Sequence, residues 1–428
     1  MKNILFLVLL LSFSSFSYSQ IAYAKKTIKR LSSKKMQGRG YVKNGDLKAA
    51  NYIASEFKKN KLTALGDDFF QRFDISVNTQ PSSLKITIND NSPLIPGLDF
   101  LINPASPSLK GSFQTIHINA KELLNRVILI KKLKSSKGKV LLIDTYILDD
   151  FSKTKKSEIS KIINYLTYSQ ENPAKATLIF TSKKLTWSGS TFVNKNLTAT
   201  IHKNMDLKQI RTVNFDIKSE FYQKYTTQNI IGFLKGYSKT DSTIVITAHY
   251  DHLGKMGKKT IFPGANDNAS GVALLLNLSK YYSTKTNQPK YNMLFIAFGA
   301  EELGLLGSKY YTENPKLPLE KIKFMLNFDL AGTGSKGIKV VNATEFTSEF
   351  KKLQELNEEN NLLAAVYPRA PACNSDHCYF YQKNVPVFYI YTLGGISAYH
   401  DINDKYNTLP LTMFIEYSNL IKLFINEL

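Results

Sequence analysis

Five residues of the kinds that bind metal ions lie in the second half of the chain, each after or at the end of a short apolar segment. They are His249, Asp267, Glu302, Asp329 and His400. Imidazole nitrogens and carboxylate oxygens together suit a borderline divalent cation, most often zinc. The residue types therefore predict a zinc site.

The number of candidate ligands indicates two ions. A catalytic zinc ion keeps about three protein ligands and leaves one position open for water. Five ligands are too many for one open site, but one carboxylate shared between two ions would give each ion three. Two ions about 3.5 to 4 Å apart can share a water, lower its pKa and polarise the carbonyl group that it attacks. We therefore expect two Zn²⁺ per chain and a hydrolytic reaction.

Two further acidic residues can take part in this chemistry. Glu301 precedes Glu302, and because neighbours cannot easily face one metal together, one can bind metal while the other acts as general base. Asp251 lies two residues beyond His249 and can orient its imidazole through the other ring nitrogen. Each residue alone could instead be a cap, a turn former or a charge favoured at a helix start. Their common placement favours the functional interpretation.

The elements that must position these residues are apolar strands alternating with helices. We predict strands at 243–247, 293–298, 324–328 and 385–391, and helices at 270–282 and from 303 to 311. Near-continuous apolar strands joined by helical crossovers indicate an α/β fold with a mostly parallel, helix-covered central sheet. Ligands of such sheets bind beyond the carboxyl ends of the strands, which is where the candidates lie.

The middle of the chain has a different character. Residues 91–222 contain short β-rich runs separated by loops rich in Ser, Lys and Asn, which predicts a smaller, β-rich inserted domain. The main domain would then consist of an N-terminal part, residues 20–90, and a metal-binding part, residues 223–428.

Residues 1–19 have the outline of a secretory signal peptide. Lys2 is followed by the apolar run 4–11, and Ser17 and Ser19 form a small-x-small pattern before Gln20. A membrane anchor is the alternative, but the apolar run is far shorter than the about 20 residues that a spanning helix needs. We expect a secreted or periplasmic protein without a membrane span.

The net charge of +22 raises the question of a nucleic-acid partner. Only six of the 56 basic residues are arginine, the residue that phosphate and guanine recognition favours. The lysines are spread along the whole chain and no nucleic-acid-binding motif accompanies them. We expect a solvated basic surface and no nucleic-acid partner.

Several motifs resemble the secreted dizinc aminopeptidases of metallopeptidase family 28. The matching segments are Met36–Gly40, His249–Asp251, Gly264–Gly271, Phe298–Ser308, Asn327–Asp329 and Ser375–His377. The resemblance implies the zinc exopeptidase fold. It also implies that Asp267 bridges the two ions.

The remaining roles also follow from the resemblance. It implies that Glu302 and His400 complete one metal site, that His249 and Asp329 complete the other, and that Glu301 is the base. Members of the family often carry a protease-associated domain before the metal-binding half, and Gly138–Asp144 resembles one of its core strands. Such a domain would shape access to the cleft and contribute no metal ligand.

Cys373 and Cys378 leave two possibilities open: a local disulfide, which some relatives have in the corresponding region, or two buried thiols. They lie beside the Ser375–His377 motif, but lack the spacing of a structural zinc site.

We therefore expect a secreted zinc aminopeptidase that removes N-terminal residues from peptide substrates. Three alternatives remain open on the same fold: a carboxypeptidase, a glutaminyl cyclase with one zinc ion, and a non-catalytic receptor-like module.

Overall fold

The computed structural model describes residues 19–428. The predicted signal peptide lies outside the described residues except for its last position. The described chain begins with a helix over residues 19–31, followed by α2 (Gly45–Lys59). These residues contain no helix that is both long enough and apolar enough to cross a membrane.

The larger of two main sheets has eight strands, and its centre is parallel. Its strands, in spatial order, are β1 (Phe70–Thr79), β9 (Glu220–Leu234), β13 (Asn292–Phe298), β10 (Thr243–His249), β14 (Ile322–Phe328), β17 (Val387–Thr392), β15 (Ile338–Val341) and β16 (Val366–Arg369). The four central strands, β13, β10, β14 and β17, pair in parallel. On one side, β9 pairs antiparallel with both β13 and β1. On the other side, β15 is antiparallel to β17 and parallel to β16. The four predicted strands are the parallel centre, which confirms the predicted fold class.

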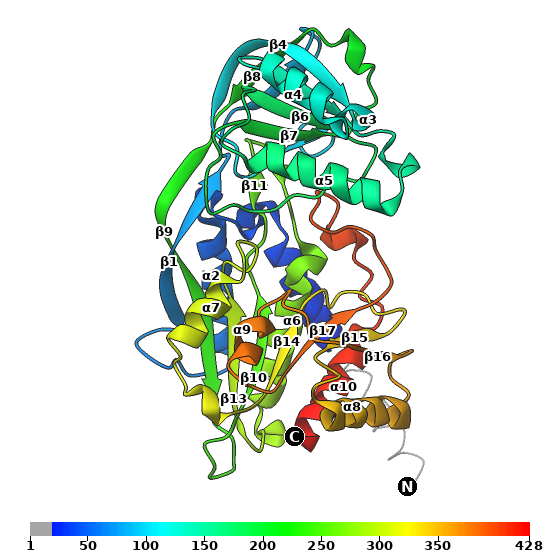
Figure 1. Ribbon diagram of the computed structural model, residues 1–428. Coiled ribbons are helices and arrows are strands. Elements are labelled where there is room, and N and C mark those ends of the chain that lie inside the picture. The colour runs from blue at the N-terminus through cyan, green and yellow to red at the C-terminus, as the bar shows by residue number, and fades with distance from the viewer. Residues whose placement is uncertain (1–18) are drawn as a thin grey trace.

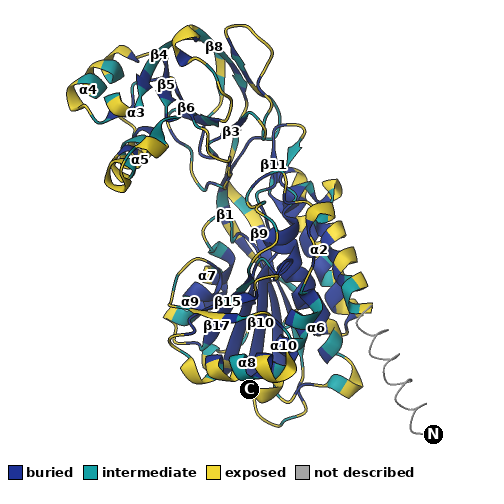
Figure 2. Ribbon diagram, turned by 90° about the vertical axis from the view of Figure 1, so that its right-hand side faces the viewer, coloured by how far each residue is buried: buried dark blue, intermediate teal, exposed yellow. Residues whose placement is uncertain are grey.

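Helices cover both faces of this sheet. α2, α6 (Gly271–Tyr282), α8 (Thr347–Asn360) and α10 (Phe414–Glu427) contribute to the apolar core on one face. α7 (Leu306–Glu313) and α9 (His377–Gln382) contribute Tyr311 and Phe380 to the core on the other face. Every residue of β10 and β13 is buried as a result, as the dark centre of the lower lobe in Figure 2 shows. Burial on both faces is the reason that these strands are apolar throughout.

α7 begins three residues later than the pattern predicts. Gly304 has a φ of +103° and Leu305 a φ of +61°, so the chain makes a left-handed turn before the helix starts. This turn keeps Glu301 and Glu302 in a loop above the sheet.

A second, seven-stranded sheet forms the upper lobe in Figure 1. Its strands, in spatial order, are β2 (Leu84–Ile88), β8 (Thr212–Ile217), β4 (Leu109–Asn119), β5 (Val140–Asp144), β6 (Ala176–Phe180), β7 (Leu197–Ile201) and β3 (Phe100–Ile102). Three helices accompany it: α3 (Ala120–Leu123), α4 (Arg126–Ser135) and α5 (Lys153–Tyr168). We refer to residues 84–217 as the smaller lobe; the predicted insert was 91–222.

A long strand pair and a short hairpin link the larger lobe to the smaller lobe. β1 and β9 form a long antiparallel pair that runs between them, visible along one side of the molecule in Figure 1. The hairpin of β11 (Lys255–Met256) and β12 (Thr260–Ile261) leaves the larger sheet after β10, and its Met256, with Phe262 just beyond it, packs into the core of the smaller lobe.

Candidate metal centre

The predicted ligands come together beyond the carboxyl ends of the parallel strands. His249 is the last residue of β10, and Glu301 and Glu302 follow β13. Asp329 follows β14, and His400 lies in the loop after β17. Asp267 lies in the segment between β12 and α6. Parallel strands end at the same edge of a sheet, so residues far apart in the chain meet there.

Asp267 lies at the centre of this group, with its two carboxylate oxygens facing different histidines. Its Oδ1 is 3.4 Å from Nε2 of His249, and its Oδ2 is 3.0 Å from Nε2 of His400. The side chain is 4% exposed, so both oxygens are withdrawn from solvent. One carboxylate therefore lies between two imidazoles.

Each histidine has a second carboxylate next to it. Asp329 Oδ2 is 3.5 Å from Nε2 of His249, and Glu302 Oε2 is 3.2 Å from Nε2 of His400. His249, Asp267 and Asp329 have donor atoms close enough to hold one ion together. A second such group consists of His252, Asp267 and Glu302, and the predicted ligand His400 lies beside its two carboxylates. Asp267 belongs to both groups.

The two adjacent glutamates have different surroundings. Glu302 Oε1 is 2.7 Å from Nδ1 of His252, in addition to its contact with His400. Glu301 makes no such short contact among the described residues, and its Oε2 is 4.0 Å from Nε2 of His249. Glu301 can also hold an ion together with His249 and Glu302, but its carboxylate has no close histidine partner of its own.

Asp251 braces the backbone of this glutamate pair. Its carboxylate accepts hydrogen bonds from the amides of Glu301 at 3.1 Å and Glu302 at 3.3 Å. The ring nitrogen Nδ1 of His249 is 3.2 Å from the carbonyl oxygen of Asp251 and 3.9 Å from its carboxylate Oδ1. The imidazole is thus oriented mainly by the backbone of Asp251.

The segment around Asp267 is held by two buried residues that are not among the predicted site residues. Arg39 is fully buried and donates hydrogen bonds to the carbonyl oxygens of Tyr250, Pro263, Gly264 and Asp267. The Asp404 carboxylate accepts from the amide of Asp267 at 2.9 Å and from that of Asn266. The sequence signal for Arg39 was only its place in the Met36–Gly40 motif.

The turn that precedes Asp267 requires glycine. Gly264 has a φ of +56°, and a side chain at this position would collide with the carbonyl oxygen of Asp267 and with the guanidinium of Arg39. The peptide bond between Asp267 and Asn268 is cis.

The electrostatics of the group favour cations. Burial opposes protonation of His249, yet the carboxylates of Glu301 and Asp329 raise its pKa well above the ordinary value. Burial also works against ionised Asp267, but hydrogen bonds from His249 and His400 hold its pKa well below the ordinary value. The carboxylates therefore draw positive charge to this point, and divalent ions supply more of it than protonated imidazoles.

The lack of a hydrogen-bond donor at one buried carboxylate oxygen also favours a metal site. Among residues 19–428, no donor reaches the buried Oδ1 of Asp329. A buried carboxylate oxygen without a partner is costly, and a coordinated cation removes that cost. A set of histidine and carboxylate ligands of this size suits zinc.

The smaller lobe contacts the ligand His400 directly. The carbonyl oxygen of Trp187 is 3.0 Å from Nδ1 of His400, and the amide of Trp187 donates to the carbonyl oxygen of His400 at 2.9 Å. The Trp187 indole donates to the Ile102 carbonyl of β3 and stacks on Phe262 at 4.7 Å. His400 is thereby held with Nε2 toward Asp267.

The ligand group opens into a cavity of about 490 Å³. The ligands His249, Asp267, Glu302, Asp329 and His400 line it together with Glu301, Gly304, Leu330, Arg369, Asn374, Tyr389, Tyr391 and Tyr399. Tyr399 stacks on His400 with 4.0 Å between ring centroids. The cavity has room for the end of a peptide.

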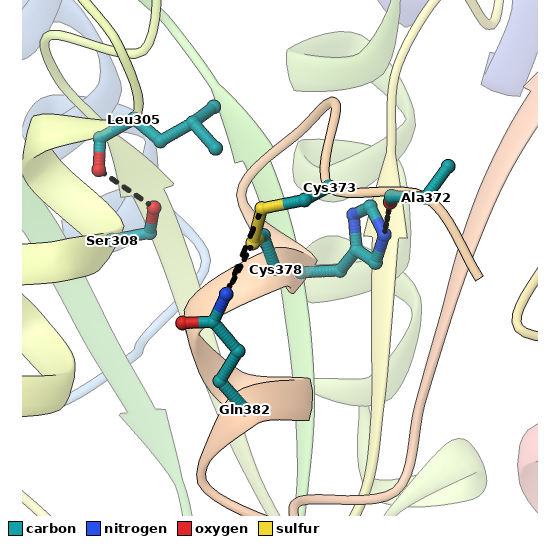
Figure 3. Close-up of a disulfide and its surroundings, with 7 residues drawn as sticks. Leu305, Ser308, Ala372, Cys373, Cys378 and Gln382 are labelled. Atoms are coloured by element: carbon teal, nitrogen blue, oxygen red, sulfur yellow. Dashed lines mark hydrogen bonds between the residues drawn. A yellow bond between two sulfur atoms is a disulfide. The ribbon is translucent and has the colours of Figure 1, made fainter.

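Cys373 and Cys378 form a disulfide, as Figure 3 shows, and Asn374 within the loop that it closes lines the cavity. Within the loop that it closes, His377 stacks on Tyr389, and its Nε2 is 2.8 Å from the Ala372 carbonyl oxygen. Burial lowers the pKa of His377 to about 4, so this imidazole is neutral at physiological pH. His377 thus braces the loop.

Sequence comparison identifies the domain that carries these residues. Residues 229–425 match the profile of peptidase family M28. Aminopeptidase YwaD of Bacillus subtilis is 29% identical over 294 residues, which cover 67% of this chain and 56% of the relative. A probable leucine aminopeptidase of Arthroderma otae is 28% identical over 248 residues, which cover 52% of this chain and 64% of the relative. The chain thus spans little more than half the length of these relatives.

Solved structures share the fold over nearly the whole chain. The zinc aminopeptidase BSAP of Bacillus subtilis superposes with a TM-score of 0.69 at 22% identity, covering 95% of this chain and 94% of that one. A peptidase M28 precursor of Shewanella amazonensis gives 0.68 at 17% identity, with 96% and 95% covered. At these identities the likeness establishes the fold. The profile match shows that residues 229–425 form a domain of peptidase family M28, and the chain is similar in sequence to aminopeptidases.

Proposed function

We propose that the chain is an aminopeptidase that removes N-terminal residues from peptides with the help of two zinc ions. The observation that carries the proposal is the position of Asp267, whose two oxygens face His249 and His400 separately. A carboxylate so placed suits a bridging ligand, with Asp329 completing the group around His249 and Glu302 that around His400.

The roles of the residues follow from their surroundings. When bound, zinc lowers the pKa of a water in the centre and polarises the carbonyl group that is attacked. Glu301 lies beside the ligand group without a short contact of its own, so its carboxylate is free to accept the proton from that water. It then delivers the proton to the leaving amine. Asp251 keeps Glu301 in place through its backbone amide.

The names of the relatives support the peptidase class. YwaD and the protein of Arthroderma otae are described as aminopeptidases, and BSAP as a zinc aminopeptidase.

The test combines a metal count with end-labelled peptides. We expect about two zinc ions per chain, and shortening of free peptides from the N-terminus while N-acetylated peptides stay intact. Cleavage of N-acetylated peptides from the C-terminus would identify a carboxypeptidase instead. One zinc ion with pyroglutamate as product would identify a glutaminyl cyclase, and a chain without turnover or metal would be a receptor-like module. Each of these three results rejects the proposal.

We also propose that the protein is exported, with cleavage near Gln20. The Gln20 side chain accepts a hydrogen bond from Lys422 of α10 at 3.1 Å, so a chain that begins at Gln20 keeps this contact. N-terminal sequencing of protein recovered outside the cytoplasm should start near Gln20, and a chain retained intact in the cytoplasm would contradict export.

The smaller lobe is proposed to shape access to the cavity, as a protease-associated domain would. The metal-ligand groups found among residues 19–428 contain no residue of 84–217. Its contribution to the centre is the support of His400 by Trp187.

A further inference from the structure

Among the described residues that line the catalytic cavity, Arg369 is the one arginine or lysine. Arg369 is the last residue of β16, the edge strand of the larger sheet, and it lines the cavity together with the metal-binding residues. The side chain is partly buried. Its positive charge is therefore available inside the space that a peptide substrate would enter.

Most hydrogen-bond donors of the Arg369 guanidinium have no partner among the described residues. One of its nitrogens donates to the hydroxyl of Tyr391 at 3.1 Å, and the group lies 6.0 Å from the centre of that ring. Among the described residues, no carboxylate oxygen lies within 4.0 Å of it. A guanidinium has five N–H donors in a planar fork that matches a carboxylate.

Three of the four acids that line the cavity contact histidines, and the fourth, Glu301, is the proposed general base. Asp267, Glu302 and Asp329 each contact a histidine of the ligand group. They would be balanced by metal ions, which leaves Arg369 without a protein counter-charge. A partly buried arginine in this situation attracts an anionic group from the substrate.

Arg369 lies in the same cavity as the ligand group. The Tyr391 ring beside Arg369 is 5.4 Å from the ring of Tyr389, which stacks on His377. Both tyrosines line the cavity together with Asp329 and Glu301. A substrate that enters the cavity can therefore contact both Arg369 and the ligand group.

We propose that Arg369 is a specificity residue that binds a carboxylate of the substrate, an inference that rests on the proposed aminopeptidase function. The carboxylate can come from two sources: the side chain of an N-terminal Asp or Glu, or the C-terminus of a dipeptide. Both present the same group to the same guanidinium.

Two pairs of substrates distinguish these sources. Glu-p-nitroanilide against Gln-p-nitroanilide tests the side chain, because neither substrate has a C-terminal carboxylate. Leu-Gly against Leu-Gly amide tests the C-terminus. We expect the zinc-loaded protein to prefer the anionic member of at least one pair, and Arg369→Ala to lower kcat/KM for that member by about 10- to 100-fold.

Neutral substrates and matched variants provide the controls. In Arg369→Ala, hydrolysis of Leu-p-nitroanilide, which has no carboxylate, should fall by a smaller factor than hydrolysis of the anionic substrate, and circular dichroism reports that the variant is folded. Arg369→Lys keeps the charge but loses the fork, so it should restore only part of the preference. Arg126→Ala removes an exposed arginine from α4 of the smaller lobe and should leave every substrate unchanged.

The possible failures are distinct. Hydrolysis of Leu-p-nitroanilide with no preference in either pair would overturn the role of Arg369 and leave the aminopeptidase proposal standing. A preference that survives Arg369→Ala would do the same. No hydrolysis of any substrate by the zinc-loaded protein would overturn both.

Discussion

At the scale of single residues, the two adjacent glutamates of the candidate metal centre differ in the groups that surround them. Glu302 contacts two histidines, whereas its neighbour Glu301 is 4.0 Å from the nearest histidine nitrogen. Burial raises the pKa of the Glu301 carboxyl well above its ordinary value, although His249 opposes the shift. A carboxylate with raised proton affinity next to the ligand group is suited to proton transfer.

Glu301→Gln should therefore separate catalysis from metal binding. We expect turnover to fall by about 10² to 10⁴, the usual contribution of a positioned general base, because the amide cannot accept a proton. Zinc content, measured by elemental analysis, should stay the same. Asp267→Ala should instead lose metal, because it removes the carboxylate shared by both groups, and Glu313→Gln, an exposed position on α7, should change neither quantity. Nearly intact turnover in Glu301→Gln would remove its assigned role.

Arg39 shows how one residue can stabilise a site without touching its reacting atoms. Its guanidinium binds carbonyl oxygens on both sides of the turn before Asp267. Burial lowers the pKa of Arg39 to about 10, so it stays charged at neutral pH.

Arg39→Met should reduce the free energy of unfolding by about 3 kcal/mol or more. The substitution leaves several buried carbonyl oxygens without donors, each at a cost of about 1 to 3 kcal/mol. Urea unfolding followed by circular dichroism measures the change. Arg30→Met, at an exposed position of helix 19–31, is the matched control and should change stability by less than about 0.5 kcal/mol. Equal effects of the two substitutions would show that the buried hydrogen bonds contribute little.

At the scale of elements, α10 carries a buried cation into the main core. Tyr417, Leu420 and Phe424 of this helix are buried in the core on one face of the larger sheet. Lys422 of the same helix is 6% exposed, and burial lowers its pKa to about 8. Its ammonium donates to the side chains of Gln20 and Asn419.

This pKa predicts how stability depends on pH. The unfolded chain binds the proton of Lys422 with a pKa near 10.5, so between pH 8 and about 10.5 the unfolded state holds more protons than the folded state. Stability contributed by Lys422 should therefore rise with pH across this window and be lowest below pH 8. Compared with Lys422→Met, the wild type should gain about 2 to 3 kcal/mol between pH 7.5 and 10.5.

Urea unfolding of both proteins at the two pH values measures this difference, which cancels the titration of other groups. Lys309→Met, at an exposed position of α7, should show no such pH-dependent gap. A difference in the free energy of unfolding between wild type and Lys422→Met that stays constant with pH would contradict the lowered pKa of Lys422.

At the scale of the whole molecule, both lobes contact the candidate metal centre. Trp187 belongs to the smaller lobe, yet its backbone bonds to both the ring and the carbonyl group of His400. Lys184 of the same segment forms an ion pair with Asp401 at 2.6 Å, next to this ligand. The loop that carries His400 is thus held from outside the M28 domain.

Trp187→Ala should weaken zinc binding by about 10- to 100-fold, the usual effect of removing a group that orients a metal ligand. The substitution removes the indole that anchors this segment to Ile102 and Phe262, so the backbone contacts with His400 loosen. Competition with a zinc chelator measures the affinity. Trp187→Phe, which retains the stacking, should lose less, and Phe192→Ala at an exposed position of the same segment should lose nothing. Unchanged affinity in Trp187→Ala would show that the larger lobe positions His400 alone.

The sequence predicted the parallel strands and the ligand group because their signals are local. A fully buried strand must be apolar along its length, and a residue at its carboxyl end lies at the edge where ligands bind. β10 with His249 and β14 with Asp329 follow this rule. The start of α7 was predicted too early because the left-handed turn at Gly304 and Leu305 leaves the apolar periodicity unbroken.

By itself, the sequence determined the fold class, the set of candidate ligands and the family, since each depends on residue types at short spacing. Only the tertiary structure decided which groups surround those ligands. Arg39 lies more than 200 positions from the Asp267 turn, and Trp187 a similar distance from His400. No spacing rule connects residues so far apart, because their contact depends on how two lobes and several loops pack together. The same packing left Arg369 in the cavity without a protein carboxylate within 4.0 Å among the described residues.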